Sequence, residues 1–268
     1  MRVLIVGSGA REHAIAWKLS RERSVTDLFC APGNPGMAEI ARCLQVDPGN
    51  AEALLALARE HAIDLTVVGP ELPLSRGVVD RFEERGLRIF GPTASAARLE
   101  SSKVFAKDFM ARHGIPTARF RVCRGAAEAL RIIGSGELGW PLVIKADGLA
   151  AGKGVVIAEH ADEASATIRA VMVDRRFGSA GDHVVLEECL VGPEASYFVI
   201  ADGTQAMPLS SAQDHKRIFD DDRGPNTGGM GAFAPSPLLT PAVEQQVLDS
   251  IVRPVLEGMA AEGHPYRG

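Results

Sequence analysis

The chain has 268 residues, of which 46% are hydrophobic, and it carries 34 acidic against 29 basic side chains, a formal charge of −5. The apolar content and the lack of a glycine period exclude a disordered or collagen-like chain, and the length suits two modest domains or one large α/β domain with additions. An isoelectric point near 5.8 disfavours duplex DNA or an anionic membrane as the main partner. A local basic pocket for a phosphorylated small molecule is compatible with this charge.

The cysteines are scattered and show no spacing typical of a zinc site; they are Cys30, Cys43, Cys123 and Cys189. We therefore predict free thiols in a reducing compartment. No apolar run is long enough for a membrane span, and the first residues show no signal-peptide pattern but lead directly into a strand. A cytoplasmic protein with neither a membrane nor a nucleic-acid partner is expected.

Short apolar runs without polar alternation predict buried parallel strands in the first ninety residues. These runs stop at glycine, alanine or proline and are Val3–Val6, Leu28–Cys30, Leu65–Val68 and Leu87–Phe90. Stretches rich in Ala, Leu, Glu and Arg predict helices between them, at 11–21, 51–61 and 74–85. This alternation predicts a doubly wound sheet that binds ligands outside the carboxyl ends of its strands, at segments 7–12, 32–36 and 69–73.

The first of these segments, Gly-Ser-Gly-Ala-Arg-Glu at 7–12, is a glycine turn that feeds a helix. It suggests a dinucleotide site, but Glu12 replaces the third glycine of that fingerprint and the second strand ends without an acidic residue. A helix N-terminus favours an anion, which Arg11 could help to bind. The alternative is a tight turn with both charged side chains solvated, and the segment by itself does not distinguish the two.

Beyond an amphipathic helix expected over Lys103–His113, two β-branched runs flank a glycine and alanine segment with Lys145 before it and Lys153 within its far end. This pattern predicts a strand–loop–strand hairpin and not a P-loop, because Gly154 stands where that motif has Ser or Thr. Small residues let backbone N–H groups approach phosphate oxygens, and two ammonium groups offset their charge. A lysine in an apolar strand is costly without an anionic partner, so a phosphate site is favoured over a merely flexible hairpin.

Carboxylates stand at the end of the next apolar strand, Val184–Leu190, which we expect to pair antiparallel with a strand at 197–200. Glu187 and Glu188 stand near the end of the first strand, and Glu194 stands in the connection between the two. Any one of these carboxylates alone is equally well explained as a surface residue.

Charge and glycine then occur together without an element pattern, which predicts a long ordered loop over 213–231. Such loops commonly bring backbone donors to an anionic ligand. A stripe of apolar residues at helical spacing follows and predicts a helix that begins near Thr240 and reaches about residue 262. Pro254 is expected to kink this helix without ending it.

Six segments together resemble the phosphoribosylamine–glycine ligase family, also called the glycinamide ribonucleotide synthetases. They are 7–14, 31–34, 68–71, 144–155, 213–217 and 224–231. The last two, Gln-Asp-His-Lys-Arg and Gly-Pro-Asn-Thr-Gly-Gly-Met-Gly, are the most specific. The resemblance covers essentially the whole chain. It implies a doubly wound domain over 1–100 and an ATP-grasp module over 101–268, with the nucleotide lid lobe at about 118–190.

The resemblance implies a cytoplasmic enzyme, monomeric at full length, that uses ATP to join glycine to 5-phosphoribosylamine in purine synthesis. Glycyl phosphate is the implied intermediate, and glycinamide ribonucleotide, ADP and phosphate are the products. The chemistry agrees, because phosphoryl transfer needs charge-neutralising lysines, a covering loop and a divalent metal. The alternatives are a related purine-pathway carboxylase or formyltransferase, a nicotinamide oxidoreductase and a non-catalytic fragment.

The same resemblance implies roles for individual residues. The catalytic set is Lys145, Lys153 and Asp214. The nucleotide-binding set is Lys103, Lys145, Gly148, Gly152, Lys153, Gly154, Glu187, Glu188, Leu190 and Glu194. In this set Glu187, Glu188 and Leu190 are implied to contact the adenine edge largely through backbone groups, and Glu194 is implied to bind the ribose. The set implied for glycine and phosphoribosylamine is Arg11, Asn34, Glu71, Asp214, Lys216, Asn226, Thr227, Gly228 and Gly229.

Three departures from the family pattern stand out. Ala10 replaces a common glycine, and Cys189 replaces a usual aromatic residue beside the purine. In this family the acidic strands that bind Mg²⁺ or Mn²⁺ follow the helix at 241–262, so the metal ligands are expected C-terminal to Gly268. We therefore expect no metal ligands in this chain, and little or no activity from it alone.

Overall fold

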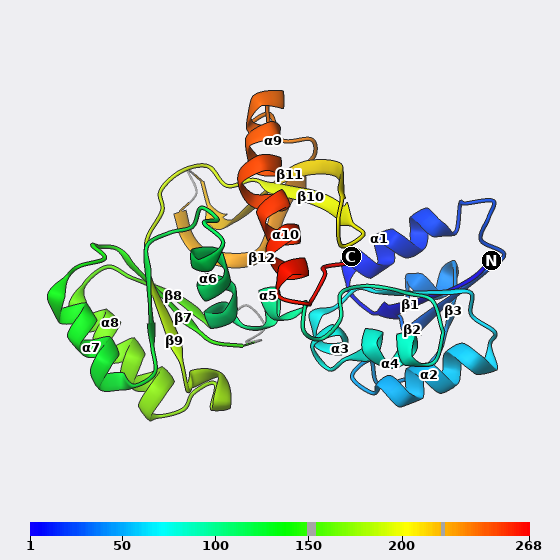
Figure 1. Cartoon of the computed structure of the whole chain (residues 1–268), viewed down its shortest axis with the longest axis horizontal. Coiled ribbons are helices and arrows are strands. Elements are labelled where there is room, and N and C mark those ends of the chain that lie inside the picture. Colours follow the sequence, from blue (N-terminus) through cyan, green and yellow to red (C-terminus); the bar gives the residue numbers. More distant parts are fainter. Residues whose placement is uncertain (149–153, 221–222) are drawn as a thin grey trace. The chain divides into compact units, whose positions relative to one another are not determined.

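The computed structural model of the chain describes residues 1–148, 154–220 and 223–268 (Figure 1). The chain divides into two compact units, which are described one at a time. Unit 1 comprises Met1–Ser102 together with Tyr266–Gly268, and unit 2 comprises Lys103–Pro265. Across the described ranges, no helix is both long and apolar enough to cross a bilayer.

Unit 1 is built on a parallel sheet, as its continuous apolar runs predict. The sheet has the strand order β3-β2-β1-β4-β5. Its strands are β1 Arg2–Gly7, β2 Asp27–Pro32, β3 Arg42–Cys43, β4 Leu65–Val68 and β5 Ile89–Phe90. Because the order runs outward from β1 in both directions, the sheet is doubly wound and its switch point lies at the carboxyl ends of β1 and β4.

Helices cover both faces of this sheet. They are α1 Ala10–Leu19, η1 Met37–Glu39, α2 Ala51–Glu60, α3 Glu71–Ser75, α4 Val78–Glu84 and α5 Arg98–Ser101. Successive residues of β1 point to opposite faces, so Leu4 and Val6 join the core with α2 and α4. Val3 and Ile5 join the core on the α1 side.

The single helix expected over 74–85 was wrong in one respect, because the structure has two helices there. The first begins directly after Pro70, and the second begins after Gly77. Gly77 has a φ of 78°, a left-handed conformation that interrupts a helix and that glycine adopts without steric cost.

Unit 2 contains a four-stranded antiparallel sheet with the order β6-β9-β7-β8. Its strands are β6 Phe120–Cys123, β7 Leu142–Ala146, β8 Val155–Ala158 and β9 Val184–Glu188. The expected strand–loop–strand hairpin is confirmed, because β7 pairs with β8 from Leu142 opposite Ala158 to Lys145 opposite Val155. The hydrophobic core lies between this sheet and the helices α7 Ala126–Ser135 and α8 Ala161–Ile168, which Figure 1 shows on one face of it.

A second, three-stranded sheet holds the polar and glycine-rich part of the chain. Its strands are β10 Ser196–Ala201, β11 Ala206–Phe219 and β12 Arg223–Phe233, in the order β10-β11-β12. The remaining helical segments of unit 2 are α6 Lys103–Arg112, η2 Arg169–Val173, η3 Gly178–Gly181, α9 Pro241–Val247, η4 Leu248–Val252 and α10 Arg253–Ala261.

Two expectations for this region were wrong. The apolar strand at 184–190 does not pair with the strand at 197–200, because both edges of β9 are already paired, with β6 and with β7. The segment 213–231 is not a loop but the antiparallel pair β11–β12, whose register shifts at two points. Charge and glycine mask the alternation of these strands, so backbone pairing and not side-chain pattern defines them.

The helix expected from Thr240 to about residue 262 is confirmed as α9, η4 and α10 in succession. The Thr240 hydroxyl accepts a hydrogen bond from the Val243 amide, which caps the first turn. The helix changes to a wider π-helical turn at Leu248–Val252, immediately before Pro254. Since proline lacks an N–H and crowds the preceding turn, a local widening there lets the helix continue.

Candidate functional site

Three charged side chains meet where β7, β9 and α6 come together. Lys145 on β7 and Glu187 on β9 are diagonal neighbours on one face of the sheet, since Val143 stands opposite Glu187. The Lys145 ammonium donates to Glu187 Oε2 at 2.9 Å, and the ammonium of Lys107, from α6, lies 3.2 Å from the same oxygen. Lys145, the lysine within the apolar strand, is thus paired with an anion, but this anion is the carboxylate of Glu187. The family resemblance implies that Glu187 contacts adenine largely through its backbone.

Burial within this cluster is graded. The side chain of Glu187 is 5% exposed, that of Lys107 is 10% exposed, and that of Lys145 is 28% exposed. The second carboxylate oxygen of Glu187, Oε1, is buried and has no hydrogen-bond partner among the described residues. An unsatisfied buried acceptor is costly, so this oxygen marks a position where a ligand could supply a donor.

The base of the glycine and alanine segment is tied to the start of α6. Lys103 donates from Nζ to the Gly148 carbonyl at 2.9 Å, and the Val104 amide donates to Asp147 Oδ1 at 3.2 Å. Across the hairpin, the Ala146 amide donates to the Gly154 carbonyl at 2.8 Å. Gly152 and Lys153, predicted for the lid, lie outside the described residues.

Glu188, the neighbour of Glu187 on β9, points to Arg119. It accepts hydrogen bonds from the Arg119 amide at 2.8 Å and from Arg119 Nε at 2.6 Å, and these bonds hold the pKa of Glu188 below its ordinary value.

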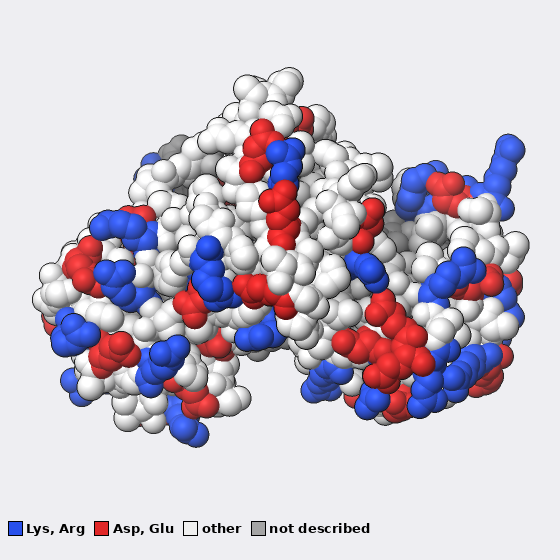
Figure 2. All heavy atoms as spheres, in the orientation of Figure 1, with Lys and Arg blue, Asp and Glu red and all other residues white. Residues whose placement is uncertain are grey.

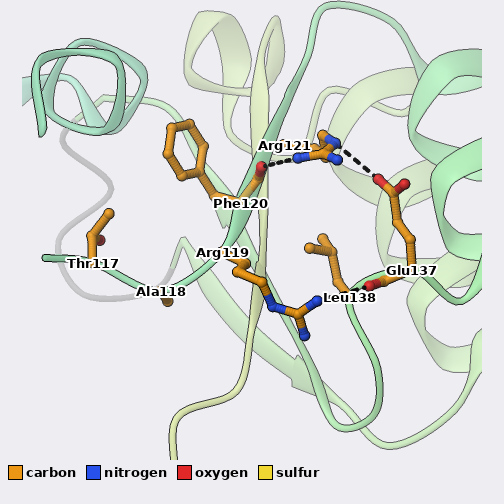
Figure 3. A pocket seen from close by; sticks show the side chains of 7 residues that line it. All are labelled: Thr117, Ala118, Arg119, Phe120, Arg121, Glu137 and Leu138. Atoms are coloured by element: carbon orange, nitrogen blue, oxygen red, sulfur yellow. Dashed lines mark hydrogen bonds and ion pairs between the residues drawn. The ribbon is translucent and has the colours of Figure 1, made fainter. Parts of the chain in front are cut away.

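Arg119 also lines a pocket at the start of β6, shown in Figure 3 with Arg121 turned toward Glu137. Its lining residues are Thr117, Ala118, Arg119, Phe120, Arg121, Glu137 and Leu138, none of which the sequence assigns to a ligand. Leu190, predicted for the adenine edge, is 71% exposed.

Residues predicted for ribose and for the acceptor substrates meet on the three-stranded sheet. Lys216 Nζ donates to Glu194 Oε1 at 2.6 Å and lies 3.6 Å from Asp214 Oδ1. The hydrogen bond to Glu194 is the main cause of the raised pKa of Lys216, to which the charges of both carboxylates add while burial opposes them. Lys216 therefore remains charged, between two carboxylates on the surface of the strand pair.

The glycine-rich strand β12 lies against the backbone of Lys216. The Thr227 hydroxyl donates to the Lys216 carbonyl at 2.9 Å and accepts from the Gly229 amide at 3.1 Å. No atom of the described residues lies within 4 Å of a Cβ built on Gly228 or Gly229, so among these residues the strand has open space beside it. Asn226 pairs through its backbone with Arg217, and its side chain lies outside the described residues.

Three further predicted residues belong to unit 1, at the carboxyl ends of its strands. Arg11 donates to Glu71 at 2.9 Å. This hydrogen bond is the main cause of the raised pKa of Arg11. Burial acts to raise the pKa of Glu71, but the hydrogen bond from Arg11 and a backbone hydrogen bond outweigh burial, so the pKa of Glu71 is lowered. Asn34 bridges two loops, because it donates to the Ser8 carbonyl at 3.0 Å and accepts from the Met37 amide at 2.9 Å.

Two family models match the chain and together span it. One, described as phosphoribosylglycinamide synthetase, N domain, matches residues 1–100, and the other, phosphoribosylglycinamide synthetase, ATP-grasp (A) domain, matches residues 101–268. The chain belongs to the phosphoribosylglycinamide synthetase family. The family that the six sequence motifs indicate is therefore confirmed, as is an α/β fold with an ATP-grasp module.

Named relatives agree with the family models. The phosphoribosylamine–glycine ligase of Xanthomonas campestris pv. campestris is 52% identical over 270 residues, covering 100% of this chain and 62% of that protein. The crystal structure of the same-named ligase from Thermotoga maritima matches with a TM-score of 0.81 at 35% identity, covering 100% of this chain and 63% of that one. The chain thus spans less than two thirds of the length of these synthetases.

A more distant protein resembles this chain in its fold alone. The biotin carboxylase domain of 2-oxoglutarate carboxylase from Hydrogenobacter thermophilus, solved with MgADP, matches with a TM-score of 0.73 at 21% identity, covering 100% of this chain and 59% of that one.

The family implies a divalent metal, and we asked whether the residues present could hold one. In the part of the chain that the structure describes, no three His, Cys, Asp or Glu side chains gather as metal ligands do, so no metal site is assigned.

Two residues that the sequence did not assign to a site stand out. One is Lys107, whose distant partner Glu187 no local pattern could reveal. The other is Glu12, which is 3% exposed and whose Oε2 accepts from the Gly9 amide at 2.7 Å. A Cβ on Gly7, Gly9 or Gly69 would lie within 3 Å of the Glu12 side chain. The glycine turn therefore encloses the Glu12 carboxylate. This carboxylate occupies the Gly9 amide that a dinucleotide phosphate would use, which argues against the oxidoreductase alternative.

Proposed function

We propose that this chain is part of a cytoplasmic ATP-dependent ligase that joins glycine to 5-phosphoribosylamine, giving glycinamide ribonucleotide, ADP and phosphate. The observation that carries the proposal is the cluster of Lys145, Glu187 and Lys107 beside the glycine and alanine hairpin. It offers a partly exposed ammonium for phosphate oxygens and, at Glu187 Oε1, a buried acceptor for an amino group such as that of adenine. The family membership and the named relatives support the same function.

In the proposed reaction, ATP phosphorylates the glycine carboxylate, and the amine of phosphoribosylamine then displaces phosphate from glycyl phosphate. Lys145 and Lys153 would offset the charge of the transferred phosphoryl group. Asp214 and Lys216 would orient the acceptor substrates, together with the backbone of the segment Asn226–Gly229. In unit 1, Arg11, Asn34 and Glu71 would bind the sugar phosphate. Mg²⁺ or Mn²⁺ would neutralise phosphate charge when bound, and no step is assigned to it.

Nucleotide titrations test this proposal directly. We expect calorimetry to show that the chain binds ATP but not NADH. Lys145→Met keeps the stem of the side chain and removes its charge, so loss of a charge-assisted contact should cost roughly 1.5–3 kcal/mol of ATP affinity. Lys18→Met is the matched control, because Lys18 lies on the surface of unit 1 and pairs only with its helix neighbour Glu22 in the contacts described.

Two results would contradict the proposal. NADH binding in preference to ATP would restore the oxidoreductase alternative. Unchanged ATP affinity in Lys145→Met, with far-ultraviolet circular dichroism showing an intact fold, would remove Lys145 from the nucleotide site.

A further inference from the structure

Lys107 is a buried cation with a specific set of partners. It lies on α6, its side chain is 10% exposed, and its ammonium is shared between Glu187 Oε2 at 3.2 Å and Thr117 Oγ1 at 2.5 Å. The ring of Phe120 lies beside it, with its centroid 5.5 Å from the ammonium. Taking an ammonium out of water is costly unless its charge is answered, so Lys107 depends on Glu187.

Glu187 in turn is shared between two cations. Both ammonium groups approach the same oxygen, Oε2, one from the hidden side of the cluster and one from the partly exposed side. The cluster holds two positive charges and one negative charge, and Lys145 is its most exposed member at 28%. The excess positive charge therefore reaches the solvent at Lys145.

We propose that Lys107 is a positioning residue that serves as the internal counter-ion of Glu187 and so leaves the charge of Lys145 available to the phosphates of a nucleotide. This inference rests on the proposed function, because it concerns the same nucleotide site. Without Lys107, Glu187 has Lys145 as its one remaining cation in this cluster, and the two charges would cancel. A neutral ion pair attracts a phosphate group far less than an ammonium with an excess charge.

The ratio of ADP affinity to adenosine affinity measures the phosphate-dependent part of binding. The inference predicts an order for this ratio across the unmodified chain and three variants, because the net charge of the cluster falls in one variant, rises in the second and is restored in the third. Lys107→Met should lower the ratio about tenfold, which is about 1.4 kcal/mol. Glu187→Gln should raise it above that of the unmodified chain. The double variant Lys107→Met/Glu187→Gln should return it to within about threefold of the unmodified value, because Lys145 again carries the single excess charge.

A merely structural role for Lys107 predicts a different result, in which ADP and adenosine weaken together and the ratio stays constant. That result, or a double variant with a ratio as low as that of Lys107→Met, would overturn the inference. If Lys107→Met does not fold, the comparison of Glu187→Gln with the double variant decides, since equal ratios in these two would also overturn it. Lys18→Met serves again as the control for removing a lysine charge.

Failure of the inference differs from failure of the proposed function. If the unmodified chain binds neither ADP nor adenosine, the nucleotide site itself is wrong. If it binds ADP more tightly than adenosine and the variants do not follow the expected order, the site stands and the role of Lys107 is refuted.

Discussion

The enclosure of Glu12 by glycines makes Gly69→Ala a severe test of the packing in unit 1. A Cβ on Gly69 would lie 2.2 Å from Glu12 Oε1 and 2.3 Å from its Cγ. On its other side the Glu12 side chain already lies close to the backbone of Gly7, since a Cβ built on Gly7 would be 2.6 Å from the Glu12 Cγ. Glu12 must therefore leave its position and lose the 2.7 Å hydrogen bond from the Gly9 amide.

The cost has two parts. Overpacking a filled site costs about 1–3 kcal/mol, and loss of a hydrogen bond to a charged group costs about 1.5–3 kcal/mol, so Gly69→Ala should destabilise unit 1 by roughly 3–5 kcal/mol. Glu12→Ala removes Cγ and the carboxylate, which are the atoms in the way. In that background the same Gly69→Ala change should cost only about 0–1 kcal/mol, so the two substitutions should be strongly non-additive.

The two tryptophans allow this measurement unit by unit. Trp17 lies in α1 of unit 1, and Trp140 lies in unit 2. Urea unfolding followed by Trp17 fluorescence in a Trp140→Phe background therefore reports on unit 1. Gly134→Ala in unit 2 is a control for the exchange itself, because no atom of the described residues lies within 4 Å of its Cβ position in α7. Followed by Trp140 fluorescence in a Trp17→Phe background, it should stabilise unit 2 by about 1 kcal/mol. An additive cycle, or a cost below about 1 kcal/mol for Gly69→Ala, would refute the reasoning.

Two further predictions follow from pKa shifts. Hydrogen bonds from His113 and then Arg112 lower the pKa of Glu262 below its ordinary value of 4.5, so the stability they contribute is present above pH 4.5 and lost as the pH falls below it. Glu262→Gln should weaken this acid dependence of the unfolding midpoint of unit 2, whereas Glu257→Gln, at an exposed position of α10, should leave it in place. Burial raises the pKa of the Cys30 and Cys123 thiols to about 12, so iodoacetamide at pH 8 should label half-buried Cys189 before either of these two; peptide mapping that finds Cys30 modified as fast as Cys189 would contradict this.

The parallel sheet of unit 1 was predictable because burial on both faces leaves continuous apolar runs such as Val3–Val6. The hairpin around Lys145 and the capped helix at Thr240 were predictable for similar local reasons. Strand β3 was not, because the two residues Arg42 and Cys43 are too few to show a period. The pairing of β11 with β12 was missed because charged residues and glycines interrupt any alternation over 213–231, so that backbone pairing defines the strands there.

The candidate site shows the same division between local and distant information. A lysine within an apolar strand signals that an anion must be near, and the structure supplies one. Which anion it is depends on strand register, since Glu187 becomes a neighbour of Lys145 only because β9 pairs with β7. Lys107 carries no local signal, because its burial comes from the packing of α6 over the sheet, which a one-dimensional pattern does not contain.

Unit 1 includes Tyr266–Gly268 and is therefore assembled from two stretches of chain that are separated by all of unit 2. A ribosome adds about 5–20 residues per second, so the five strands leave the exit tunnel roughly 10–30 s before Tyr266 is made. During that time the nascent sheet must persist without Tyr266–Gly268. Glu83 then lacks the ion pair with Arg267, whose guanidinium lies 3.9 Å from its carboxylate in the folded unit. The first unit is thus completed only after all of unit 2 has been synthesised, although its strands are made well before unit 2.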